Sequence, residues 1–173
     1  MHSRIIALIV LLVASATSVQ ARSNWIVYAP KGPGFRVELP TEPSVNSSTV
    51  RTTHGQARAT YFVFKGENGL EGRMEVKDYA PGQIGKDPRG YLDESRGSYE
   101  SRSRSPLRSE SRFTLDGAPA HRFVMNTADG RAAKIQEMVI GDRFISVICF
   151  VPKGQENSSD VERIFKSFAL TKA

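Results

Sequence analysis

The chain has 173 residues, of which 39% are hydrophobic and 9% aromatic, and it carries a formal net charge of +6. This composition is ordinary for a globular protein, and the length is enough for one domain with a hydrophobic core. The only cysteine, Cys149, excludes an internal disulfide, so the stability of the fold must come from its core.

The first 21 residues are typical of a secretory signal. Arg4 precedes an apolar run from Ile5 to Val13, and Val19 and Ala21 stand at positions −3 and −1 of a cleavage site. The nine-residue run is too short to span a bilayer. We therefore expect a signal peptide over residues 1–21, with an uncleaved membrane anchor as the alternative.

Residues 22–173 are expected to form a single exported domain, periplasmic or secreted, with no stable membrane span after cleavage. Removal of Arg4 with the signal lowers the net charge from +6 to +5. A mildly basic exported domain is suited to acidic proteins, anionic lipid or polysaccharide. Nucleic acid is not expected as a partner of a chain that leaves the cytoplasm.

Short apolar or alternating runs bounded by turn residues predict strands in nine places. These are residues 24–29, 35–40, 48–54, 57–65, 72–80, 107–115, 118–126, 131–140 and 143–151. The last four are separated by the tight-turn pairs Asp116-Gly117, Asp129-Gly130 and Gly141-Asp142, which predict an antiparallel meander.

One helix is predicted after Asp87, because Asp87 suits the N-cap and Pro88 suits the first helical position. The following segment places Tyr91, Leu92, Ser95 and Tyr99 on one weakly apolar face.

A second helix is predicted near the end of the chain, where Ser159 and Glu162 have the spacing of a capping box. Val161, Ile164, Phe165 and Phe168 then follow at i, i+3, i+4 and i+7. This apolar face must be buried against another layer.

The segment "RFISVICFV", residues 143–151, is apolar on both faces. Phe144, Ile148 and Phe150 point to one side, while Cys149 belongs to the other. The pattern predicts a central strand that is covered on both sides, with Cys149 as a buried and unreactive core residue. The terminal helix supplies one cover, and the Asp87 helix and N-terminal loops are the candidates for the other.

These elements predict an α+β fold: an antiparallel sheet of about six to eight strands with helices on both faces. The segments "FRVELPTEP", "LDGAPAHRF" and "ERIFKSFAL", in this order, resemble a group of small secreted bacterial proteins of uncharacterised function. That group is similar in fold to the PsbP and DcrB-like α/β/α sandwiches. The resemblance implies an accessory or binding role and transfers no active-site residue.

Catalytic motifs are not evident in the sequence. It contains no G-x-S-x-G, and beyond the expected signal its histidines are His54 and His121. His54 is expected in a solvated turn, and His121 shares a face with Phe123 and Met125, which favours a packing role. Two distant histidines and one core cysteine do not suggest a metal site, and no cofactor is expected. A pair of catalytic carboxylates stays open as an alternative.

The unusual feature is an arginine-rich segment between residues 89 and 112. It contains Arg89, Arg96, Arg102, Arg104, Arg108 and Arg112, no lysine, and the acids Asp93, Glu94, Glu100 and Glu110. Six positive and four negative charges leave +2, and the planar guanidinium suits phosphate or carboxylate. These six arginines are the candidate binding residues, with a solvated mixed-charge surface as the alternative.

The expected function is therefore a non-enzymatic accessory or binding domain of the bacterial cell envelope, which binds an envelope protein or an anionic envelope component. A hydrolase with an unmarked carboxylate site is one alternative. Binding of anionic lipid or polysaccharide through the arginine-rich segment is the other. The partner and the oligomeric state stay open.

Overall fold

The computed structural model describes residues 25–171, so the expected signal peptide over residues 1–21 lies outside the described residues. The large sheet consists of β3 (Ser44–Thr52), β4 (Gly55–Lys65), β5 (Glu71–Tyr79), β6 (Leu107–Leu115), β7 (Ala118–Asn126), β8 (Ala132–Ile140) and β9 (Arg143–Val151). The other elements are β1 (Ile26–Tyr28), β2 (Phe35–Leu39), α1 (Pro88–Ser103), α2 (Ser159–Ser167) and β10 (Ala169–Leu170).

The seven strands of the large sheet are antiparallel and lie in the order β3-β4-β5-β9-β8-β7-β6. The last four strands form the meander predicted from the tight turns. At the β6–β7 turn, Asp116 and Gly117 both have positive φ angles, 48° and 87°. A two-residue turn with both residues in the left-handed region matches the twist of the strands it joins, which is why Asp-Gly is favoured there.

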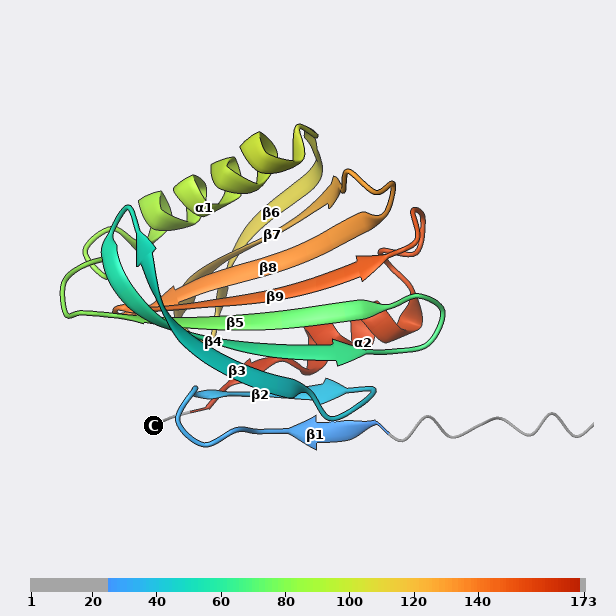
Figure 1. Cartoon of the computed structure of the whole chain (residues 1–173), viewed down its shortest axis with the longest axis horizontal. Helices are drawn as coiled ribbons and strands as arrows, with labels where there is room; N and C mark the ends of the chain where they lie inside the picture. The colour runs from blue at the N-terminus through green and yellow to red at the C-terminus, as the bar shows by residue number, and fades with distance from the viewer. Residues whose placement is uncertain (1–24, 172–173) are drawn as a thin grey trace, which may run out of the picture.

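The large sheet is covered on both faces (Figure 1). Helix α1 crosses one face, while α2 and a small sheet of order β1-β2-β10 lie on the other. The predicted α+β class and the covering helices are thus confirmed. The N-terminal strands, however, lie on the side of α2 and not on the side of α1, because β2 pairs with β10 directly after α2.

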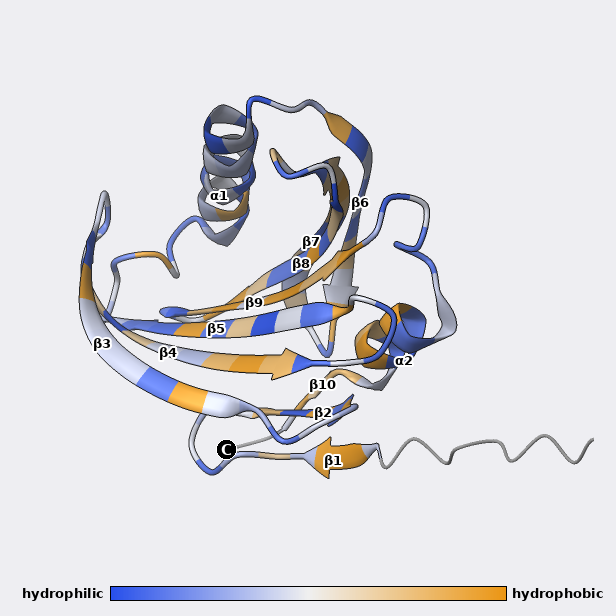
Figure 2. Ribbon diagram, turned by 45° about the vertical axis from the view of Figure 1, so that its right-hand side comes forward, coloured by the Kyte–Doolittle hydropathy of each residue, from blue (hydrophilic) through white to orange (hydrophobic). Residues whose placement is uncertain are grey.

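The two helices differ in character, as Figure 2 shows: α2 has a hydrophobic side and α1 is mostly hydrophilic. Beneath α2, the rings of Phe35, Phe165 and Phe168 join the main core cluster. Strand β9 lies between β5 and β8 at the centre of the sheet, and Cys149 is fully buried. The prediction of a central strand covered on both faces is confirmed.

The start of α1 matches the prediction, since Asp87 is the N-cap and its carboxylate accepts a 2.9 Å hydrogen bond from the amide of Gly90. The predicted capping box of the second helix is wrong. Its N-cap is Ser158 without a side-chain cap, and Glu162 pairs instead with Lys134 (2.5 Å) and Lys166 (3.3 Å). The ion pair with Lys134 of β8 draws the Glu162 carboxylate away from the N-terminus of α2, so it does not cap that helix.

Candidate functional site

A row of polar side chains crosses the sheet on the face covered by α1. Its six members are directly opposed from strand to strand, so they share one face: Tyr61, Glu75, Ser146, Glu137, His121 and Arg112. We call them the polar row. The four inner members are buried, with exposed fractions between 0% and 6%. Buried charges of this kind are rare unless they are paired, so the row is the first place to look for function.

Two separate apolar clusters flank the polar row. Tyr79, Tyr91 and Phe144 belong to the first, which packs under the start of α1. Phe123 and Ile148 belong to the second, which contacts the later turns of the helix. The row therefore divides the hydrophobic core beneath α1 into two parts.

Glu137 is the centre of the buried network. Its Oε2 lies 2.8 Å from Nε2 of His121, and its Oε1 accepts a 3.0 Å hydrogen bond from the hydroxyl of Ser95 on α1. Burial raises the pKa of Glu137, and the neighbouring His121 and Ser95 act in the opposite direction. In a catalytic triad the serine hydroxyl donates to the histidine. Here the hydroxyl of Ser95 donates to Glu137, so His121 does not activate it as a nucleophile.

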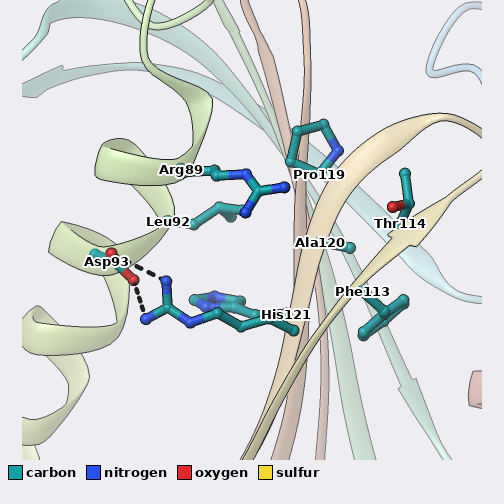
Figure 3. A pocket seen from close by; sticks show the side chains of 9 residues that line it. Arg89, Leu92, Asp93, Phe113, Thr114, Pro119, Ala120 and His121 are labelled. Atoms are coloured by element: carbon teal, nitrogen blue, oxygen red, sulfur yellow. Dashed lines mark hydrogen bonds and ion pairs between the residues drawn. The ribbon is translucent and has the colours of Figure 1, made fainter.

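The polar row opens to a pocket of about 230 Å³ at the β6–β7 edge of the sheet. Figure 3 shows Arg89 and Asp93 of α1 facing His121 of β7 across this pocket. Arg112 of β6 joins Asp93 through an ion pair of 2.7 Å between Nη2 and Oδ1. His121 is only 1% exposed, yet it forms part of the lining, so it connects the pocket to the buried Glu137.

Asp93, Glu110 and His121 have ligand atoms within 4.8 Å of one another, which is close enough to consider a metal ion. Arg112 already pairs with both acids, at 2.7 Å to Asp93 and 3.3 Å to Glu110. A cationic side chain in this position neutralises the carboxylates and repels a metal ion. The cluster is therefore better explained as an ion-pair network.

A second opening lies on the other side of α1, toward β3, β4 and β5. This cavity of about 350 Å³ is bordered by Tyr61, Glu75 and Lys77 of the sheet and by Tyr99 and Arg102 of α1. The polar row thus meets a hollow at both ends, and α1 lies between the two hollows.

His54 borders the space beside this cavity and does not behave as the solvated turn residue expected from the sequence. Its Nε2 lies 2.8 Å from Glu94, and its ring centroid is 5.0 Å from that of Tyr91. The β3–β4 hairpin curls toward α1 and brings the turn against the helix (Figure 1). His121, expected to be a packing residue, is buried as predicted, although its partner Glu137 was not foreseen.

The six candidate arginines do not gather at one site. Arg89, Arg96 and Arg102 belong to α1, Arg104 is its C-cap, and Arg108 and Arg112 belong to β6. Arg96 pairs with Glu110 at 3.0 Å, Arg108 with Glu156 at 2.5 Å, and Arg112 with Asp93 and Glu110. Among residues 25–171, Arg89, Arg102 and Arg104 form no ion pair. A binding role for the set stays a prediction.

The sequence reading missed Glu75, Glu137 and Ser146. A signal was present for Glu137 and Ser146, because each is a polar residue inside an apolar strand segment, "KIQEMVI" and "RFISVICFV". What the sequence does not display is that they stand side by side.

Comparison with models of protein families and with curated proteins found no match. Among solved structures, this chain is similar to the solution structure of cyanobacterial PsbP (CyanoP) from Synechocystis sp. PCC 6803, with a TM-score of 0.58 and 9% sequence identity. The match covers 92% of this chain and 98% of that chain. The fold is PsbP-like. At this identity the likeness shows the architecture alone, so it confirms the fold implied by the sequence motifs and assigns no activity.

Proposed function

We propose that this protein is an exported, non-enzymatic accessory or binding domain of the bacterial cell envelope. Export is supported by the signal pattern of residues 1–21. The resemblance of three sequence segments to small secreted bacterial proteins and the PsbP-like fold agree with an accessory role. Neither α1 nor α2, the helices of the described residues, is long and apolar enough to cross a membrane.

The observation that carries the binding role is the pair of hollows on either side of α1. Each is lined by a polar side chain that a neighbouring carboxylate holds in place: His121 by Glu137 of the adjacent strand in one, and Lys77 by Glu75 of the same strand (3.1 Å) in the other. Fixed polar groups in a concave surface recognise a partner at little entropic cost, because their side chains are already ordered.

A hydrolase is the second candidate, and a specific observation favours it. The buried Glu137 has a raised pKa and contacts His121, which reaches the 230 Å³ pocket, so a proton relay to a substrate is geometrically possible. Against it, the hydroxyl of Ser95 on α1 donates to Glu137 and has no base.

The experiment combines localisation with site-directed photocrosslinking. A photoreactive residue is placed at Ser98, which is exposed on α1 beside the second hollow, and a control at Lys166, which is exposed on α2. We expect the protein in the periplasmic or secreted fraction and one envelope component captured from Ser98 alone. Equal capture from both positions would count against binding along α1.

The hydrolase alternative is tested on the same purified protein with ester and glycoside substrates. Turnover that disappears in His121→Asn and persists in the control His54→Asn, whose histidine is half-buried and lies outside this pocket, would favour an enzyme. Export is scored separately, so a cytoplasmic location would overturn only that part of the proposal.

A further inference from the structure

The cavity between α1 and β5 has an unbalanced charge. Its walls carry the cationic side chains Arg73, Lys77 and Arg102, and Glu75 is the acid among them. Arg73 and Lys77 rise from the same face of β5, since both alternate with buried Met74 and Val76 that point to the opposite side. Arg51 also borders the cavity, but it alternates with Val50, which packs on the α1 side, so its side chain points to the other face. The three cationic side chains on the cavity side and one acid leave two positive charges in excess.

The acid in the cavity is already engaged. Glu75 lies 3.1 Å from the ammonium group of Lys77, and it is 6% exposed. Arg73 makes no ion pair among residues 25–171, and its Nε is buried without a hydrogen-bond partner among the same residues. A buried guanidinium donor without an acceptor is costly, and an oxyanion in the cavity would remove that cost.

Arg102 approaches the same space from α1. Its Nε donates to the carbonyl of Ser98 at 3.1 Å, and its guanidinium carbon lies 5.2 Å from the centre of the Tyr99 ring. These contacts fix the arm of the side chain and leave its terminal amino groups for another acceptor. A guanidinium fork in a fixed position binds carboxylate or phosphate through two parallel hydrogen bonds.

Uncharged donors complete the walls. The hydroxyls of Tyr61 and Tyr99 are protonated at neutral pH, as for any tyrosine, and burial raises the pKa of both further. Ser95 adds a third hydroxyl, although its proton is directed to Glu137. The cavity therefore combines positive charge, hydroxyl groups and aromatic surface.

We propose that this cavity binds a small organic oxyanion, and that a phosphate monoester fits it best because the two excess positive charges match a dianion. The volume of about 350 Å³ lies in the range of small-molecule sites and admits a phosphate group with a small ring beside the tyrosines. The inference rests on the proposed binding role and not on export. Oxyanion binding and export are measured separately, so failure of one is distinguished from failure of the other.

The test uses phenyl phosphate as the probe in isothermal titration calorimetry, with benzoate and inorganic phosphate as further arms and benzyl alcohol as the uncharged control. We expect saturable binding of phenyl phosphate that weakens with added salt, and none of benzyl alcohol. Arg73→Gln and Arg102→Gln should each weaken binding about tenfold or more, since each removes a charged hydrogen bond. Arg58→Gln, an exposed arginine of β4 on the opposite face of the sheet, should bind as the parent does.

Two further arms remove ambiguity. Compared with Arg102→Gln, Arg102→Lys should recover only part of the affinity for phenyl phosphate if the guanidinium fork matters. Arg102 is exposed on α1, so its replacement should leave the fold intact. Vesicles containing phosphatidylglycerol, compared with pure phosphatidylcholine, distinguish a lipid headgroup from a soluble phosphate. If neither the three anions nor the vesicles bind, or if Arg73→Gln and Arg102→Gln bind as Arg58→Gln does, the proposal is overturned.

Discussion

His121 and Glu137 face each other from neighbouring strands β7 and β8, with Nε2 of the histidine 2.8 Å from Oε2 of the glutamate. Their exposed fractions are 1% and 0%, so this is a polar contact within the core and not a surface ion pair. Removing one member of such a pair leaves the other unsatisfied in a place that water does not reach, which is the most damaging kind of polar substitution.

Replacing Glu137 should change how stability depends on pH. Burial raises the pKa of Glu137 above its ordinary value of 4.5, so above that pH the folded protein keeps a proton that the unfolded chain has released. The free energy of unfolding should therefore fall as pH rises from 4.5 to the pKa of the folded state. Urea unfolding of Glu137→Gln across this range should lack that decline. Glu67→Gln, exposed in the β4–β5 turn, is the control and should retain it.

Cys149 should be chemically inert in the folded protein. Burial raises the pKa of its thiol to about 12, so little thiolate exists at neutral pH. We expect no reaction with a bulky maleimide until the chain is unfolded. Cys149→Ser should destabilise the fold by about 1–3 kcal/mol if the hydroxyl finds no acceptor, and Cys149→Ala should cost less. Rapid labelling of the native thiol would show that the centre of the sheet is accessible.

Phe165 should be an anchor of α2. It is 3% exposed, and the guanidinium of Arg122 and the ammonium of Lys134 lie 5.1 Å and 5.5 Å from the centre of its ring. Phe165→Ala should lower the free energy of unfolding by about 3–5 kcal/mol. Lys166→Ala, the next residue along the chain and largely exposed, should change it by less than about 0.5 kcal/mol. Equal melting temperatures for the two variants would mean that α2 is not docked.

Export should remove the first 21 residues. The charged start, the apolar run and the small residues before the site predict cleavage after Ala21, which makes Arg22 the first residue of the exported protein. Intact-mass measurement of the protein from the envelope fraction checks this. A membrane-bound product that retains Met1 would support the alternative of an uncleaved anchor, and a variant with Val19→Arg should be processed poorly if the site is as stated.

The arginine-rich segment should bind anionic surfaces through Arg89, Arg102 and Arg104, which form no ion pair among residues 25–171. Arg108 is unsuited to a test, because its replacement strands Glu156, which is 7% exposed. Replacing Arg89, Arg102 and Arg104 together with glutamine should leave folding intact and weaken sedimentation with phosphatidylglycerol vesicles at low salt. Unchanged sedimentation would identify the segment as a solvated surface.

The sequence predicted those parts of the fold that depend on neighbouring residues. Asp116-Gly117 specified a turn through its left-handed backbone, Asp87-Pro88 specified a helix start, and the two apolar faces of residues 143–151 specified a central strand. Each of these features is decided within a few residues. The error at Ser159 had a different origin, because a distant lysine, Lys134, competes for the carboxylate that would have closed the capping box.

The candidate site could not be predicted from neighbouring residues in this way, because it depends on which residues of paired strands stand opposite one another. Glu137 and Ser146 belong to strands joined by a tight turn, but Glu75 belongs to β5, far earlier in the sequence, and a slip of one residue in any pairing would turn a side chain to the other face. Only the folded sheet places them in one line. The two cavities beside α1 depend in addition on where the helix crosses the sheet.

The pairing of β2 with β10 has a consequence for the order of folding. Arg36 lies opposite Ala169, and the hydroxyl of Ser167 accepts a 2.9 Å hydrogen bond from the amide of Glu38. These contacts join segments separated by more than a hundred residues. The entropy lost in closing so long a loop must be overcome before the contacts add to the stability of the fold. The meander can form from neighbouring hairpins as soon as its own strands are present. The small sheet needs β10, which follows the meander in the chain, so we expect the layer beneath the large sheet to close after the meander has formed.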